Sequence, residues 1–139
     1  MKKAVALIFF CLVFNTISSA GTTAFTLGGK LNNSLPEPRL RHPIYDTVII
    51  NGDQPLEFSW WNDFMDTGGF ILRIYKGYNT YADSLILKER FPHNIDSFKV
   101  RADLFEEGKV YTWSLIRISL AGYKSDKIFN SFKIIKNKK

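Results

Sequence analysis

Short stretches of alternating apolar and polar residues recur through the last two-thirds of the chain. In LEFSWW at 56–61, for example, apolar side chains at every second position alternate with Glu57 and Ser59. A period of two is the pattern of a β-strand with one buried face. Seven such stretches are present: Tyr45–Ile50, Leu56–Trp61, Phe70–Tyr75, Leu85–Phe91, Ser97–Ala102, Val110–Leu120 and Phe129–Ile135.

Turn-forming residues separate these stretches, as in Asn51-Gly52-Asp53 and Asp66-Thr67-Gly68-Gly69. Strands spaced about 8–12 residues apart are typical of sandwiches and barrels. Beyond the N-terminal segment, no window carries a helical period over a helical length. The sequence therefore predicts an all-β fold, a seven-stranded antiparallel two-sheet sandwich.

Alternation also assigns side chains to faces. The positions predicted to face the core include Phe58, Trp60, Leu72, Tyr111 and Trp113. The opposite face of the stretch at 110–120 begins with polar residues and ends with aliphatic ones. Two interpretations are open: an exposed apolar strip, or a bulge after Leu115 that turns the aliphatic residues inward and Arg117 outward.

An apolar patch on an outer sheet face is typical of a partner-binding site. If the strip is exposed, the neighbouring stretch at 70–75 extends it, and an arginine there supplies a polar anchor. The candidate partner face consists of Ile71, Arg73, Tyr75, Ile116 and Ile118.

The chain begins with a charged pair, Lys2 and Lys3, followed by an apolar run to Phe14 and by Ser18-Ser19-Ala20. This is the pattern of a secretory signal peptide, and its apolar run is too short to span a bilayer. We therefore expect an exported protein whose membrane contact is limited to a cleaved signal. Its predicted parts are a signal peptide at 1–20, an extended arm or linker at 21–43, a sandwich at 44–136 and a basic tail at 137–139.

Removing 20 of the 139 residues leaves 119, the size of one domain. Cys11, the only cysteine, lies in the signal, so the mature chain is expected to have no disulfide, thiol nucleophile or cysteine metal site. Losing Lys2 and Lys3 lowers the formal net charge from +6 to +4. The remaining basic residues are scattered, which argues against a nucleic-acid partner.

The arm contains three glycines and three prolines and is expected to form short strand pieces at most. Thr23–Leu27 could add a strand to the open edge of a neighbouring subunit. The alternative is a disordered spacer.

Catalytic and metal motifs are lacking in the sequence. His42 and His93 both lie beside a proline in predicted loops, without a serine or aspartate constellation. The acidic turn at 51–53 does not have the spacing of an EF-hand loop. No glycine-rich phosphate loop opens a helix. We expect a non-enzymatic protein with no catalytic residues, cofactor or metal.

Four aromatic residues in predicted loops form a second candidate surface, for carbohydrate: Trp61, Phe64, Tyr78 and Tyr81. Exposed aromatic rings beside asparagine and aspartate can stack on sugars. The alternative is that these rings fold back onto the edge of the sandwich.

Spaced core positions across residues 44–136 resemble a fibronectin type III domain. The stretches that carry the resemblance are Phe58-Ser59-Trp60, GFILRIY at 69–75, LFEEGKVYTW at 104–113, Gly122 with Ser125, and Phe132 with Ile134. Departures are the second tryptophan, Trp61, and the lack of the usual proline after Trp60. No Arg-Gly-Asp tripeptide supports integrin-type adhesion.

The resemblance implies that Tyr111 forms a tyrosine corner, with its hydroxyl bonded to backbone near residues 103–105. It also implies that Trp113 packs across the sandwich near Trp60.

Together these observations predict an exported binding or assembly module of the cell envelope or cell surface. Its partner is expected to be a protein or a second copy of the chain, and carbohydrate is the alternative. The signal does not distinguish a periplasmic, cell-surface or secreted destination.

Overall fold

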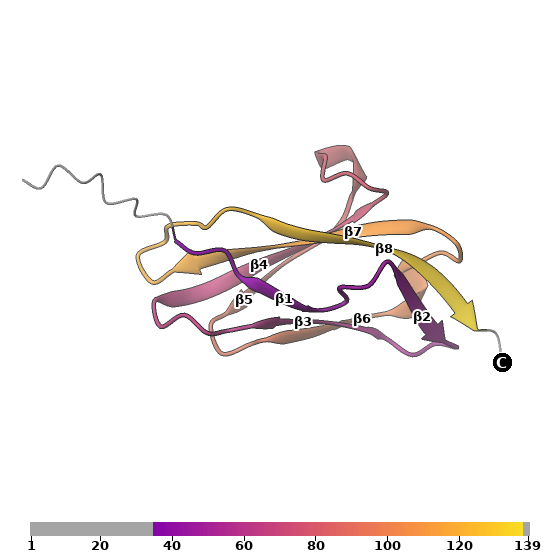
Figure 1. The fold of residues 1–139 in the computed structure, drawn as a ribbon, viewed down its shortest axis with the longest axis horizontal. Coiled ribbons are helices and arrows are strands. Elements are labelled where there is room, and N and C mark those ends of the chain that lie inside the picture. Colours follow the sequence, from indigo (N-terminus) through magenta and orange to yellow (C-terminus); the bar gives the residue numbers. More distant parts are fainter. Residues whose placement is uncertain (1–34, 138–139) are drawn as a thin grey trace, which may run out of the picture. The chain divides into compact units, whose positions relative to one another are not determined.

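The computed structural model describes residues 35–137; the predicted signal peptide, most of the arm and the last two residues of the tail lie outside the described residues. Figure 1 shows the strands, and two short 3₁₀ segments lie between them along the chain. The elements are β1 (Arg39–His42), β2 (Thr47–Asn51), β3 (Leu56–Trp61), β4 (Thr67–Lys76), η1 (Ala82–Ser84), β5 (Leu85–Pro92), β6 (Ser97–Val100), η2 (Ala102–Leu104), β7 (Val110–Ser119) and β8 (Ile128–Asn137).

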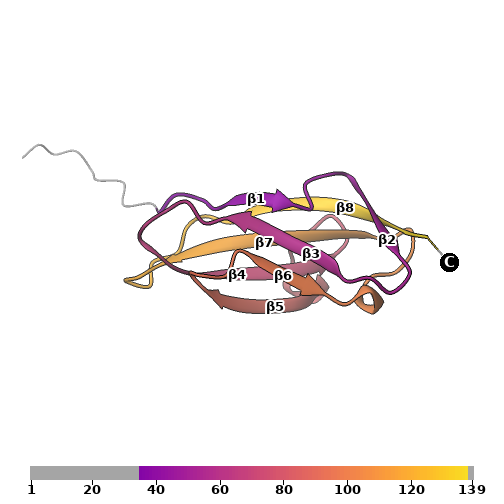
Figure 2. The ribbon, with the colours of Figure 1, turned by 90° about the horizontal axis from the view of Figure 1, so that it is seen from below.

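Two sheets face each other, as Figures 1 and 2 show from two sides. One has the order β1-β3-β6, and the other has the order β2-β8-β7-β4-β5. The all-β, two-sheet sandwich is thus confirmed. The described residues form eight strands, so the predicted number of seven is wrong.

The additional strand, β1, lies in the segment predicted to be an arm or linker. It pairs antiparallel with β3, with Arg39 opposite Trp61. Leu35, Pro38 and Pro43 around it are buried. Residues 35–43 therefore belong to the sandwich, although their prolines break the alternation by which strands are recognised.

The strand β2 pairs with β8 in parallel, with Val48 opposite Ile134. The prediction of a wholly antiparallel sandwich is therefore wrong for this pair. The chain crosses between β1 and β2 from an edge of the smaller sheet to an edge of the larger one. The alternation of apolar and polar residues shows which face of a strand is buried, but it does not show whether the strand runs parallel or antiparallel to its partner.

The strand β4 begins three residues before the predicted start at Phe70 and includes Gly68 and Gly69. A Cβ atom at Gly69 would lie 2.4 Å from the carbonyl oxygen of Phe91 on β5. The register of β4 against β7 shifts between Thr67 and Gly69. Glycine thus permits a close backbone approach beside a bulge, where the sequence suggested only a turn.

The core between the sheets contains all five predicted core residues, each at most 1% exposed: Phe58, Trp60, Leu72, Tyr111 and Trp113. Trp113 packs edge-on against Phe58, with 5.2 Å between ring centroids. Trp60 instead lies against Phe70 and Phe91. Trp113 therefore packs across the sandwich as expected, and its ring contact is with Phe58, two residues before Trp60 on the same face of β3.

Tyr111 is buried beside Phe105, and its hydroxyl accepts the backbone N–H of Glu106 at 2.8 Å. The tyrosine-corner geometry is therefore present, with a partner one residue beyond the expected range of 103–105. The bond satisfies a phenol that would otherwise be buried without a partner.

Candidate functional site

The strand β7 keeps one alternation along its length. Its register against β4 is unbroken from Tyr111 to Arg117. Arg117 therefore lies on the inner face with Trp113, and Ile116 and Ile118 lie on the outer face. The interpretation of a bulge after Leu115 is wrong.

The predicted partner face comes together on the outer face of the five-stranded sheet. Ile71 lies opposite Ile116, and Tyr75 lies opposite Thr112. However, Ile71 is 8% exposed, Tyr75 is 3% exposed and Ile118 is 4% exposed. The residues are adjacent as predicted, but the expectation of an exposed apolar strip is wrong.

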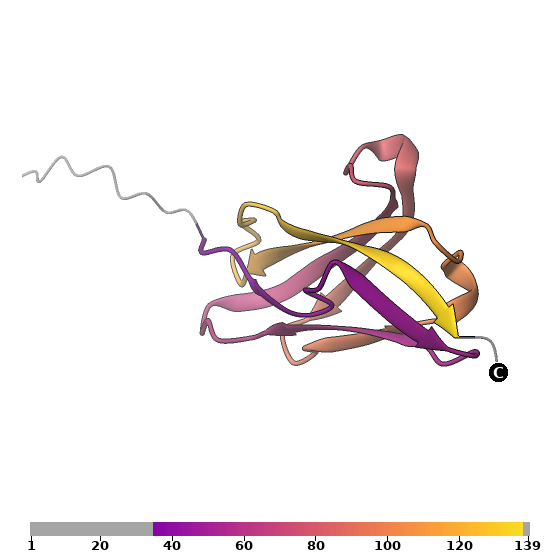
Figure 3. The same ribbon diagram turned by 45° about the vertical axis from the view of Figure 1, so that its right-hand side comes forward.

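The loop between β4 and β5, residues 77–84, is bonded to this outer face. Thr112 Oγ1 donates to the carbonyl oxygen of Gly77 at 2.7 Å, and Lys127 Nζ donates to the hydroxyl of Thr80 at 2.7 Å. In Figures 1 and 3 the loop projects beyond β7 on the side away from the smaller sheet. The two bonds attach the loop to β7 and to the segment before β8, on a face where Ser114 is fully buried.

Basic side chains surround the rest of the outer face. Lys88 of β5 lies opposite Arg73, and Arg90 lies opposite Ile71. From the other side Lys124 forms a β-bridge with Ile118. The basic residues are Arg73, Lys88, Arg90 and Lys124, and we refer to them with Ile71 and Ile118 as the outer basic face.

The outer basic face contains a surface pocket of about 380 Å³. Its lining consists of Ile71, Lys88, Glu89, Arg90, Ile118, Gly122 and Lys124. None of the ion pairs found within residues 35–137 includes a basic residue of this face. Unneutralised cations around a pocket produce a positive potential that attracts acidic groups.

Sequence reasoning missed Lys88, Arg90 and Lys124. The signal was present in part, because Lys88 and Arg90 are two residues apart and share a strand face. Their position beside Ile71 depends on the pairing of β4 with β5, and that of Lys124 depends on the turn after β7.

The structure divides the four aromatic residues predicted to contact carbohydrate. Trp61 and Phe64 precede β4, whereas Tyr78 and Tyr81 follow it, so the length of the ten-residue strand separates the two pairs. Tyr78 and Tyr81 are exposed. A single sugar-binding platform from all four is not formed, and carbohydrate binding by either pair remains a prediction.

The rings of the first pair are engaged by arginines. The guanidinium carbons of Arg39 and Arg41 lie 5.7 and 5.0 Å from the ring of Trp61. That of Arg117 lies 5.2 Å from the ring of Phe64. Such cation–π contacts occupy ring faces that would otherwise be available to a sugar.

Arg117 is 1% exposed and joins three parts of the chain. It donates to Asp63 Oδ1 at 3.1 Å and to the carbonyl oxygen of Pro36 at 3.3 Å. Asp63 also pairs with Arg39. Partial burial alone would raise the pKa of Asp63, but the hydrogen bonds from Arg39 and Arg117 hold it below its ordinary 3.8. The arrangement fixes the segment before β1 and the β3–β4 loop, so we assign Arg117 a structural role.

Within residues 35–137, no group of three or more histidine, cysteine or acidic side chains is arranged to hold a metal ion. His42 lies on β1 and His93 in the loop after β5. The described part of the chain also contains no helix with the length and apolar character of a membrane span.

No family model matches the chain, and no curated protein matches its sequence. A solved structure from the computer-based redesign of a β-sandwich protein is similar, with 10% sequence identity and a TM-score of 0.54. The match covers 76% of this chain and 95% of the other. At this level of identity the likeness shows the sandwich fold alone.

Proposed function

We propose that the protein is an exported, non-enzymatic binding module of fibronectin type III character, acting in the cell envelope or on the cell surface. It binds an acidic region of a partner protein through the outer basic face. The observation that carries this proposal is the set of basic side chains around Ile71 and Ile118, none of which forms an ion pair within residues 35–137.

The chemistry of this face favours a macromolecular partner. Basic side chains supply long-range attraction, and the apolar residues between them supply contact area once the partner is seated. The pocket is formed by sheet residues and one turn, and its lining lacks the convergent acid, base and nucleophile that a catalytic site needs. The tyrosine corner and the sequence pattern support the fibronectin type III character.

The proposal is tested with Lys88→Glu/Lys124→Glu and the matched control Lys99→Glu/Lys109→Glu. Both variants change the net charge by the same amount, and the control residues are exposed and lie outside the outer basic face. Purified protein carrying a photo-cross-linker at Ile116 is incubated with the native envelope fraction. We expect the face variant to lose at least ten-fold of its cross-linked product while the control retains it, and the yield to fall with added salt.

Equal loss in both variants would mean that net charge alone drives the association. Equal retention would remove the outer basic face from the proposal. The carbohydrate alternative is separated by Tyr78→Ala/Tyr81→Ala, which should leave the cross-linked product unchanged if the partner is a protein bound at the basic face.

A further inference from the structure

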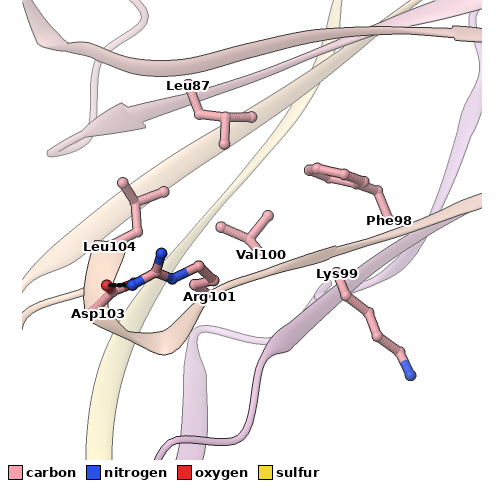
Figure 4. A pocket seen from close by; sticks show the side chains of 7 residues that line it. All are labelled: Leu87, Phe98, Lys99, Val100, Arg101, Asp103 and Leu104. Carbon is pink, nitrogen blue, oxygen red and sulfur yellow. Dashed lines mark hydrogen bonds and ion pairs between the residues drawn. The ribbon is translucent and has the colours of Figure 1, made fainter.

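An apolar groove runs along the open side of the sandwich, between the edge strands β5 and β6. Leu87 of β5 faces Phe98 and Val100 of β6 and Leu104 of η2, as Figure 4 shows. The groove has a volume of about 490 Å³. At its rim Arg101 pairs with Asp103, and Lys99 points away from it. Except for this ion pair, the surface facing the groove is aliphatic or aromatic.

The strand β6 has a free edge along this groove. It is the last strand of its sheet, and β5 is the last strand of the other. The carbonyl oxygen of Asp96 accepts the N–H of Trp60 on β3, so backbone groups of every second residue from Asp96 point toward β3. The groups of Ser97 and Lys99 therefore point to the free edge, where an added strand would bond to them.

The chain itself contains a segment suited to this edge, in Thr23-Ala24-Phe25-Thr26-Leu27. Phe25 and Leu27 are two residues apart, so a strand at the edge would direct both into the groove and Thr26 away from it. The segment has no charged residue, and the face that it would contact is apolar.

The topology favours the segment of another copy over that of the same copy. The described chain enters at Leu35, four residues before Arg39, which lies opposite Trp61 at one end of β3. Val100 lies opposite Leu56 at the other end of β3. Figure 2 shows the start of β1 and the η2 segment toward opposite ends of the molecule. The strand β1, before which the described chain begins, and the strand β6 are opposite edges of the smaller sheet, and a segment from a neighbouring copy reaches β6 without crossing that sheet.

We infer that residues 23–27 of one copy add a strand to the free edge of β6 in a neighbouring copy and place Phe25 and Leu27 in the β5–β6 groove. The contact is heterologous, since the segment and the groove are different surfaces. It therefore links copies head to tail into chains or closed rings. The outer basic face is not part of this contact, so the inference is independent of the proposed partner site.

Disulfide trapping tests the inference in the chain from residue 21, which has no native cysteine. Leu27→Cys protein is mixed with an equal amount of tagged Leu87→Cys protein under mild oxidation. We expect a disulfide-linked heterodimer in at least ten-fold higher yield than with Lys99→Cys, whose side chain points away from the groove. Equal yields with both, or no heterodimer, would overturn the inference.

A chain carrying both Leu27→Cys and Leu87→Cys distinguishes the two sources of the segment. Disulfide-linked oligomers would support the inference that the segment comes from a neighbouring copy. A monomer closed by an internal disulfide would overturn this inference. Sedimentation of the unmodified chain supplies a second measurement. Deleting residues 21–34, or introducing Phe25→Glu/Leu27→Glu, should convert a concentration-dependent assembly to monomer, while Thr26→Glu should preserve the assembly. An unaltered mass after deletion would contradict the inference.

Discussion

The two faces of β7 are both largely buried, but the burial has different origins. On the inner face Tyr111, Trp113 and Leu115 are covered by the opposing sheet. On the outer face Thr112 and Ser114 are also fully buried, on the side where the 77–84 loop is attached. Further along this face, Ile118 lies among the residues of the basic pocket.

This difference separates the residues that hold the fold from those available for recognition. Inner-face contacts involve many elements and large rings, so their loss affects the whole sandwich. Outer-face contacts involve one loop, one turn and flexible basic side chains, which can rearrange locally when a partner binds. Four predictions sharpen the comparison.

The largest effect is expected at the inner face. Trp113→Ala removes a ring that packs against Phe58 and donates from Nε1 to the carbonyl oxygen of Pro43 at 2.8 Å. We expect the free energy of unfolding to fall by about 3–5 kcal/mol. The half-buried Ile116 is the control on the same strand, and Ile116→Ala should cost less than half as much. Urea unfolding with an unchanged slope measures both, and similar losses would show that the faces do not differ.

The next effect compares two aspartate substitutions on the outer face. Ile118→Asp places a charge at a position with 4% exposure and should destabilise the fold by about 2–4 kcal/mol. Ile116→Asp, at a half-buried position, should cost about 1–2 kcal/mol and leave the chain folded at room temperature. Circular dichroism during thermal unfolding checks the order. If the Ile118→Asp variant were more stable than the Ile116→Asp variant, Ile118 would have to be accessible to solvent.

A smaller effect is expected where the loop meets β7. Thr112 Oγ1 contacts both the carbonyl oxygen of Gly77 and the hydroxyl of Ser131, each at 2.7 Å. Thr112→Val should reduce stability by about 1–2 kcal/mol and accelerate amide exchange in residues 77–84. Ser131→Ala removes only the second contact and should leave exchange in the loop near its original rate. Unchanged exchange in Thr112→Val would mean that other contacts hold the loop.

The smallest effect concerns pH. The pKa of Asp63 lies below its ordinary 3.8, so the folded chain binds a proton less readily than the unfolded chain. The resulting stability is present above about pH 4 and is lost as the pH falls through the folded pKa. Asp63→Asn should therefore flatten the decline in stability below about pH 4, measured by denaturant titration. The control Asp53→Asn changes the net charge by the same amount at an exposed carboxylate outside the ion pairs of the described chain, and equal flattening in both variants would contradict the assignment to Asp63.

The strand positions were predictable wherever alternation and turn chemistry agreed. Leu56–Trp61 has the predicted bounds, and the other six predicted stretches each overlap a strand. The strand β1 was missed because a four-residue edge strand between prolines has too few positions to show a period. The stretch predicted to end at Ala102 stops at Val100 because the chain turns there into η2.

The candidate site was predictable in part. Alternation placed Ile71, Arg73 and Ile116 on one face, and strand pairing brings them together. Alternation could not predict the burial of this face. The residues that cover it come from the 77–84 loop and from side chains whose position beside β7 no local sequence pattern shows. The same limit applies to Trp61 and Tyr78, which composition grouped and the length of β4 separates.

The sequence by itself determined seven of the eight strands of the described residues and the core side of each, because these depend on the two-residue period and on local turns. The tyrosine corner was predicted from the resemblance to a fibronectin type III domain. The tertiary structure alone decided the parallel pairing of β2, the place of Arg117 inside the sandwich and the gathering of Lys88, Arg90 and Lys124 around Ile71 and Ile118. These features depend on which strands become neighbours and in what register. That choice is made by the packing of the whole chain rather than by any single stretch.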